Sequence, residues 1–212
     1  MQKIYDISVE ISPGMILWDE DSGVIVTRVM DIKKGAEYNL TRIDLCVHNG
    51  THIDSPLHFL ENGNPVDTFS LTKLIGSAQV IKISDSIKLI TANNLQNAGI
   101  HQDTKRLLIK TGNSRYWTEN EKIFHRDYAG ITTDAAQYVV DCGIELVGID
   151  YLSISPMNEL VEPHKLLMRN NIAILETTDL SGVPAGFYDL FCLPLKICGV
   201  EGAPVRAILI GK

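Results

Sequence analysis

The chain has 212 residues, 45% of them hydrophobic, which is enough to bury one core, and we expect a single domain over residues 1–212. Its 19 lysines and arginines are scattered and outnumbered by 26 acidic residues, which argues against a nucleic-acid partner. The N-terminus lacks the apolar segment of a signal peptide, and no apolar run approaches membrane-spanning length. We therefore expect a cytoplasmic protein with no membrane partner.

Strands dominate the sequence pattern. Runs rich in isoleucine, valine and leucine predict strands at residues 4–11, 24–30, 40–48, 77–83, 106–111, 145–150, 172–177, 188–198 and 204–210. Several of these strands follow one another with no helix between them. The pattern therefore favours an α/β or α+β fold with a mixed, strand-rich sheet over a regular doubly wound fold.

Helical signals are fewer. The three expected helices lie at residues 91–98, 132–142 and 163–171. Thr91 can cap the first, which stops at Gly99, and Thr132 or Thr133 can cap the second. Pro163 suits the first turn of the third helix. Residues 112–130 have neither pattern and are expected to form a long loop, either a lid, an oligomer contact or an ordinary surface loop.

The densest polar pattern runs from His48 to His58, in the order HNGTHIDSPLH. Imidazole nitrogens and carboxylate oxygens are ligands for transition metals, and His48, His52 and Asp54 offer a set suited to Zn²⁺ or Mn²⁺. Glycine, proline and β-branched residues disfavour a helix here. In an extended chain, positions 48, 52, 54 and 58 would all lie on one face, so the run predicts a metal site.

The residues before this run alternate between apolar and polar side chains. Ile43, Leu45 and Val47 would form the buried face of a strand, and His48 would emerge on its polar face. Cys46 shares that polar face and could look into the site. The four cysteines show no CxxC pair, and a core of this size needs no disulfide, so free, mostly buried thiols are expected.

A second half of the site is indicated by His164 and Glu176, twelve residues apart. Seven helical residues rise roughly 10 Å and five strand residues roughly 16 Å, so a chain that turns back near 170–171 returns Glu176 to the level of His164. A carboxylate that follows an apolar run needs a partner if it is buried. Asp54 could bridge two cations whose remaining ligands are His164 and Glu176, which predicts a binuclear site.

These residues resemble the cyclase family of metal-dependent hydrolases, which includes bacterial kynurenine formamidase and isatin hydrolase. The motif His48-x-Gly-Thr-His52-x-Asp54-x-Pro-x-His58 carries the resemblance, together with the later histidine and glutamate. The likeness extends along the chain, through residues 13–15 with Trp18, 148–150, 193–196 and 202–207.

The resemblance implies a swivelling β/β/α fold. It also implies that His48, His52 and Asp54 hold one metal and that Asp54, His164 and Glu176 hold the other, with His58 as the catalytic histidine. A homodimer or homotetramer is implied too, and we expect residues 24–30 or 112–130 to form the contact.

Two departures from the formamidase pattern concern the substrate pocket. The family pattern reads Trp-Pro-Gly-Asp near the start, whereas this chain has Trp18-Asp19-Glu20-Asp21, so the turn that shapes the pocket can differ. Formamidases carry Pro-Ser after the mid-chain aspartate, and here Asp150 is followed by Tyr151-Leu152-Ser153.

The leading hypothesis is hydrolysis of the amide C–N bond of a small aryl or cyclic amide by metal-activated water, as in an arylformamidase acting on N-formylkynurenine. His58 would move the proton to the leaving nitrogen, and Trp18 would stack on an aromatic substrate or serve only in packing. The alternatives are an isatin-like cyclic-amide hydrolase, a metal-dependent cyclase and a metal-binding protein without turnover. A nucleophilic enzyme built on Cys46 is the weakest alternative.

Overall fold

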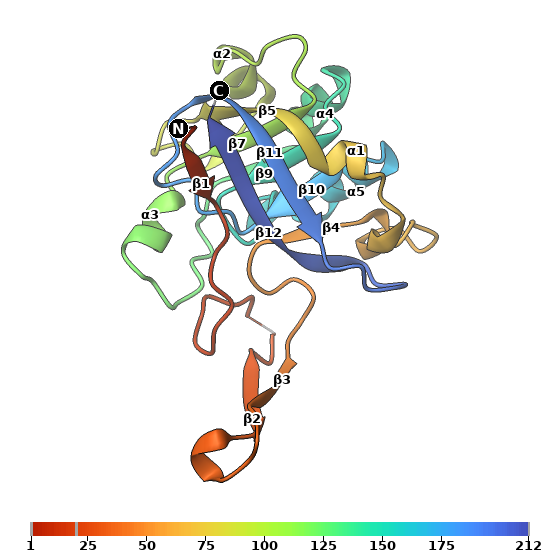
Figure 1. Cartoon of the computed structure of the whole chain (residues 1–212). Coiled ribbons are helices and arrows are strands. Elements are labelled where there is room, and N and C mark those ends of the chain that lie inside the picture. The colour runs from red at the N-terminus through yellow and green to blue at the C-terminus, as the bar shows by residue number, and fades with distance from the viewer. Residues whose placement is uncertain (1, 20, 212) are drawn as a thin grey trace.

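The computed structural model describes residues 2–19 and 21–211 (Figure 1). Its main sheet has eight strands: β1 (Ile4–Asp6), β4 (His52–Asp54), β5 (Ile75–Lys82), β7 (Arg106–Lys110), β9 (Leu146–Ile149), β10 (Ala173–Glu176), β11 (Gly186–Pro194) and β12 (Gly202–Gly211). They pair in the order β1-β12-β11-β5-β7-β9-β10-β4, and β4 also pairs with β12. That last pairing closes seven strands into a barrel, because β12 is long enough to pair with β4 along its first residues and with β1 near its end.

The barrel is mixed, with helices on its outer side. Strands β5, β7, β9 and β10 are parallel, whereas β11, β12, β4 and β1 pair antiparallel with their neighbours. The helices are α1 (Leu71–Leu74), α2 (Ala92–Asn97), α3 (Ser114–Thr118), α4 (Thr133–Asp141) and α5 (Val161–Arg169). Two small sheets join β2 (Ile25–Met30) to β3 (Leu40–Asp44) and β6 (Leu89–Ile90) to β8 (Gly130–Ile131).

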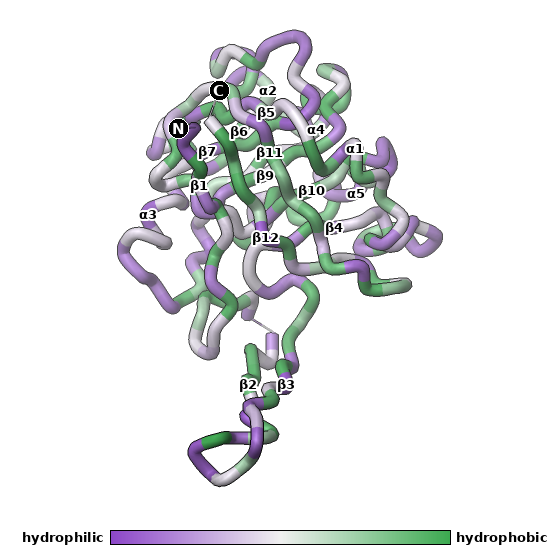
Figure 2. The backbone as a smooth tube through the Cα atoms, viewed as in Figure 1, coloured by the Kyte–Doolittle hydropathy of each residue, from purple (hydrophilic) through white to green (hydrophobic). Residues whose placement is uncertain are grey.

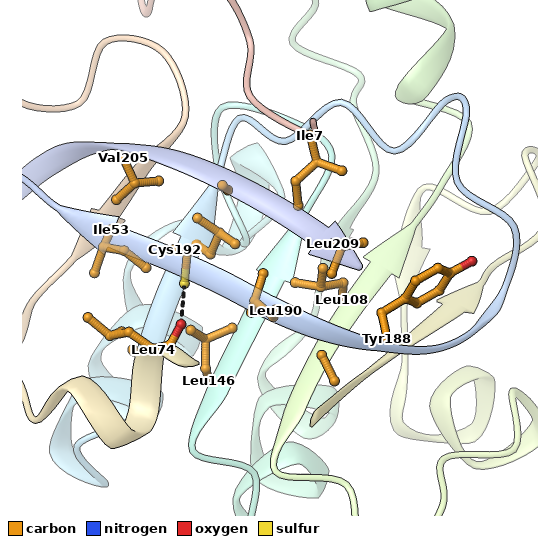
Figure 3. Close-up of a cluster of buried hydrophobic side chains, with 14 of the residues drawn as sticks. Ile7, Ile53, Leu74, Leu108, Leu146, Tyr188, Leu190, Cys192, Val205 and Leu209 are labelled. Atoms are coloured by element: carbon orange, nitrogen blue, oxygen red, sulfur yellow. Dashed lines mark hydrogen bonds between the residues drawn. The ribbon is translucent and has the colours of Figure 1, made fainter. Parts of the chain in front are cut away.

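Alternating side chains of the strands divide the core into two clusters. Leu108 and Leu146 point into the barrel, where they pack with residues of all seven barrel strands (Figure 3). Leu107, Ile109 and Val147 point the other way, into a cluster with apolar residues of α2, α4 and α5. Since strand residues alternate between faces, the middle of β7 and the whole of β9 are buried on both sides, and their residues there are apolar or glycine.

The expected helices are confirmed. Helix α2 follows Thr91, whose side chain forms a capping box with Asn94, and α4 follows Thr132. Helix α5 begins at Val161, two residues before the expected Pro163. Four short elements were not predicted from the sequence: α1, α3, β6 and β8. The expected loop at 112–130 contains two of these, α3 and part of β8.

The strand expected at residues 40–48 is only partly correct. Strand β3 ends at Asp44, and all five of its residues are exposed, so the prediction of a buried face is wrong. The reason is that, among the described residues, β3 pairs only with β2, and every residue of this two-stranded hairpin's strands is exposed. The alternation of apolar residues therefore reported strand geometry correctly but not burial.

The fold class is confirmed at the level of a mixed, strand-rich α/β structure with few helices. The pairings show a closed seven-stranded barrel rather than a specifically swivelling β/β/α arrangement. The single domain over 1–212 and the cytoplasmic location stay predictions. Within the described residues, no helix has the length and apolar character that a membrane crossing requires.

The hairpin of residues 25–44, hereafter the arm, projects from the barrel (Figure 1). Green, hydrophobic stretches of backbone alternate with purple ones along the arm in Figure 2. The arm carries many of the exposed large apolar side chains: Ile25, Val26, Val29, Met30, Ile32, Tyr38, Leu40 and Ile43. A two-stranded hairpin is marginally stable in water without a layer packed on it. The arm is therefore a surface that gains stability when something covers it.

Candidate metal centre

Strands β4 and β10 place three of the predicted ligands together. His52 pairs directly with Glu176 in the antiparallel ladder between these strands, and Asp54 lies two residues further along β4. All three are buried. His52 Nε2 lies 3.2 Å from Asp54 Oδ1 and 3.4 Å from Glu176 Oε2. The pairing register thus brings an imidazole between two carboxylates in the interior.

Helix α5 contributes His164 from its first turns. His164 Nε2 lies 3.3 Å from Glu176 Oε1, so the helix-turn-strand return predicted from the sequence does bring these two side chains together. Both are buried. Their contact extends the cluster that β4 begins.

His48 and His58 lie in turns on either side of β4. His48 follows β3 in a turn, and its Nδ1 lies 2.9 Å from Asp54 Oδ1. His58 ends a short 3-10 helix over Pro56–His58, and its ring centre lies 4.2 Å from that of His48. The expectation of one extended segment is therefore wrong outside 52–54, although the four side chains do converge.

The ligand atoms form two groups that share Asp54. One contains His48, Asp54 and His58, and the other contains His52, Asp54 and Glu176, with the ligand atoms of each group within 4.8 Å of one another. The resemblance instead implied that His48 and His52 hold the same metal and that His58 stands apart. The individual roles of these residues stay predictions.

Hydrogen bonds orient two of the imidazoles toward the cluster. His52 Nδ1 lies 2.9 Å from the carbonyl oxygen of Gly50, and His164 Nδ1 lies 2.6 Å from that of Leu160. A carbonyl can only accept, so each Nδ1 carries a hydrogen and each Nε2 faces the carboxylates. Metal-binding histidines in proteins are commonly held in this way. No local sequence pattern indicated these carbonyl partners.

The cluster fits a divalent cation. Three of its buried atoms have no hydrogen-bonded partner among the described residues: His48 Nε2, His52 Nε2 and Asp54 Oδ2. Buried polar atoms without partners are costly, and a cation would satisfy such atoms. Imidazole nitrogens with carboxylate oxygens suit Zn²⁺ or Mn²⁺.

Charges within the cluster compensate one another in the metal-free protein. Burial opposes the charged form of His52, but the adjacent carboxylates of Asp54 and Glu176 raise its pKa to about 10. Against the effect of burial, Glu176 also raises the pKa of His164. Despite burial, the nearby histidines hold the pKa of Asp54 well below its usual range. Protons on histidine thus balance the carboxylates where a cation would bind.

Cation binding should therefore release protons. His52 must lose its proton to offer Nε2 to a cation, and below its pKa of about 10 that proton is present in the metal-free protein. The apparent affinity should rise with pH up to that value, with about one proton released from His52. Calorimetric titration of zinc in buffers of different ionisation enthalpy measures the number. A release of no protons at about pH 8 would contradict this charge balance.

The cluster forms the floor of a cavity of about 480 Å³. Its walls are largely apolar, contributed by Ile16, Leu17, Trp18, Phe59, Leu152 and Leu160. Trp18 lines the cavity and packs against Phe124, with ring centres 4.7 Å apart. Its contact with a substrate stays a prediction. Glu20, in the Trp18–Asp21 segment that differs from the formamidase pattern, lies outside the described residues.

The thiols are free, but the expectation that most are buried is wrong. Cys192 is buried, whereas Cys46 and Cys198 are exposed and Cys142 is intermediate. Cys46 does line the cavity, as its position before His48 suggested.

The family model described as "Putative cyclase" matches residues 5–156. The chain is 35% identical over 217 residues to Cyclase-like protein 1 of Arabidopsis thaliana, covering 98% of this chain and 85% of that protein. It is 37% identical over 216 residues to Cyclase-like protein 2 of the same plant, covering 98% of this chain and 79% of that protein.

Solved structures agree with these matches. "The Structure Of Potential Metal-Dependent Hydrolase With Cyclase Activity" has a TM-score of 0.87 and 32% identity, covering 100% of this chain and 99% of that one. Isatin hydrolase A from Ralstonia solanacearum has a TM-score of 0.84 at 21% identity, covering 100% of this chain and 92% of that one. At that identity the likeness shows the fold alone.

Proposed function

The chain belongs to the putative cyclase family, and from that premise we propose that it is a metal-dependent hydrolase that cleaves the amide C–N bond of a small aryl or cyclic amide. The observation that carries the proposal is the pair of ligand groups sharing Asp54 at the floor of an apolar cavity. The similar solved structure named as a potential metal-dependent hydrolase supports it.

Two divalent cations, zinc or manganese, are proposed to bind each chain. His48, Asp54 and His58 fit one, while His52, Asp54 and Glu176 fit the other, with His164 beside Glu176. When bound, such cations lower the pKa of water and polarise a carbonyl. The group of His52, Asp54 and Glu176 is fully buried and would hold its cation away from bulk water. The group of His48, Asp54 and His58 is partly exposed, and its cation would meet the substrate.

His58 is proposed to carry the proton to the leaving nitrogen. Unlike the buried ligands of β4, it is exposed and lines the cavity. Although part of the His58 side chain is accessible, the residues around its ring desolvate it and lower its pKa, so the imidazole is neutral near pH 7 and free to accept a proton. The His58 imidazole can instead bind a cation together with His48 and Asp54, and mutation of His58 separates the two roles.

The apolar wall supports an aromatic substrate. Trp18 lines the cavity and is backed by the aromatic side chains of Phe124 and Tyr128, so a flat ring can lie against it. An arylformamidase acting on N-formylkynurenine is the form proposed first. Cyclic-amide hydrolysis is the second candidate, because isatin hydrolases share the fold.

A hydrolysis screen tests the proposal. The zinc- or manganese-loaded protein should cleave aryl formamides or isatin-like lactams, and the same protein treated with a chelator should not. Simple esters serve as a comparison for an unselective site. Tight binding of cations without turnover of any of these substrates would favour a metal-binding protein instead.

We also propose that the chain forms a homo-oligomer through the arm. The arm has four basic and three acidic side chains, so it carries a net charge of +1, which leaves −8 on the rest of a chain whose total is −7. An apolar, slightly basic arm on an acidic body complements a second copy of the same chain. Covering its exposed apolar side chains supplies the driving force.

Ile43→Asp should dissociate that assembly. Ile43 is 55% exposed and pairs across the hairpin with Val26, so a charge there would be buried at the proposed contact. Ile123→Asp is the matched control, since Ile123 is 70% exposed in the 112–130 segment. Sedimentation of both variants measures the mass. A monomeric wild type, or dissociation by the second variant alone, would contradict contact through the arm.

A further inference from the structure

Two loops meet at the base of the arm, one leading into β2 and one leaving β3 (Figure 1). Asp21 lies in the first and Asn49 in the second, and both line the cavity. Asp21 Oδ2 accepts a hydrogen bond from Asn49 Nδ2 at 2.7 Å. Asn49 is only 3% exposed and Asp21 is half-buried, so this charge-assisted bond is partly shielded from water.

Asn49 shapes the turn that presents His48. Its backbone N–H donates to the carbonyl of Cys46 at 3.0 Å, and its side-chain Oδ1 accepts from the backbone N–H of Cys46 at 2.9 Å. His48 is the third residue of the four-residue turn that these two bonds close. The position of the His48 imidazole therefore depends on how the Asn49 side chain is held.

Asp21 also shapes the turn that presents Trp18. Its backbone N–H donates to the carbonyl of Trp18 at 3.0 Å, and its Oδ1 accepts from the backbone N–H of Gly23 at 2.7 Å. Both carboxylate oxygens are thus in use. One fixes the loop that carries the aromatic wall, and the other reaches across to the turn of the proposed metal ligand.

We propose that Asp21 is a positioning residue that fixes the aromatic wall of Trp18 relative to His48 through the amide of Asn49. The inference rests on the proposed function for the role of His48 as a ligand and of Trp18 as a substrate contact. Its consequence is selectivity for flat aromatic amides, because the distance between the wall and the reactive centre is held constant. Loosening the Asp21–Asn49 bond should weaken binding of such substrates and of the cation at His48.

Asp21→Ala tests the proposal, with Asp31→Ala as its matched control. Asp31 lies in the arm and likewise accepts from the backbone N–H two residues on, that of Lys33, at 2.9 Å. In metal-free protein, Asp21→Ala should speed hydrogen exchange at the Cys46 amide, while Asp31→Ala should not. With zinc, only Asp21→Ala should lose affinity, by roughly the 10- to 100-fold that outer partners of a metal ligand contribute. KM for an aryl formamide should rise more than kcat falls.

A double-mutant cycle decides whether Asp21 acts through Asn49. If it does, adding Asp21→Ala to the Asn49→Ala variant should lower the zinc affinity only a little further. The proposal would be overturned if the losses of zinc affinity from Asp21→Ala and Asn49→Ala were fully additive. It would also be overturned if Asp21→Ala matched Asp31→Ala in hydrogen exchange and zinc affinity. A wild type that binds neither zinc nor manganese would overturn the proposed function, and the exchange data on metal-free protein would still decide whether Asp21 holds the His48 turn.

Discussion

Asp54→Ala should abolish binding of both cations, whereas His164→Ala should weaken binding at one. Asp54 belongs to both ligand groups, and its Oδ1 lies 2.9 Å from His48 Nδ1 and 3.2 Å from His52 Nε2. His164 touches only the side of the cluster formed by Glu176. The loss from Asp54→Ala should exceed the roughly 10- to 100-fold typical of an outer partner. Elemental analysis after reconstitution, with titration of each metal-free variant, measures both effects.

Asp54→Asn provides the control for shape. It keeps the volume of a side chain that is fully buried in β4 but removes the charge that two cations would share. It should therefore behave like the alanine variant in metal content. Equal losses in Asp54→Ala and His164→Ala would mean that Asp54 does not bridge, and a ceiling of one cation in the wild type would exclude the second site.

His58→Ala should lose roughly 10²- to 10⁴-fold in turnover while it keeps its cations and its fold. The reason is the position of His58, which is open to the cavity and neutral near pH 7, unlike the buried histidines beside the carboxylates. The acidic limb of the rate profile should change as well, because His58 contributes to it. Turnover of the best amide from the screen, together with metal content, is the measurement.

His101→Ala is the matched control for this variant, since its imidazole is exposed and close to Phe187, on the barrel strand β11. It should leave both turnover and metal content unchanged. If His58→Ala instead loses a cation and stability together, His58 is a ligand in the group with His48 and Asp54, and another group must carry the proton.

The candidate site was largely predictable because its chemistry is local in sequence. His48, His52, Asp54 and His58 lie within eleven residues, so almost any turn-rich path brings them together. The meeting of His164 with Glu176 was also predictable, since a short helix followed by a buried strand must reverse direction. The division of the ligands into two groups could not be predicted, because it depends on the strand register that sets His52 opposite Glu176.

The barrel and the arm could not be predicted for a related reason. Apolar alternation reports that a segment is extended, but it carries no information on which strand pairs with it or what covers its faces. Closure depends on the pairing of β4 with β12, about 150 residues away in sequence. The exposure of β3 follows from pairing with β2 alone. The positioning role proposed for Asp21 likewise depends on a contact between loops that no local pattern records.

The closure of the barrel also fixes when, during synthesis, the site can exist. Strand β4 is made early, yet its two neighbours are β10 and the first residues of β12, near the end of the chain. Until those residues have been made, His52 and Asp54 have no ladder to hold them opposite Glu176, so the buried ligand group cannot assemble. Pairings so distant in sequence fold slowly, because a long loop must close first. We therefore expect the proposed cation of the buried group to bind late in folding, once β12 has paired with β4.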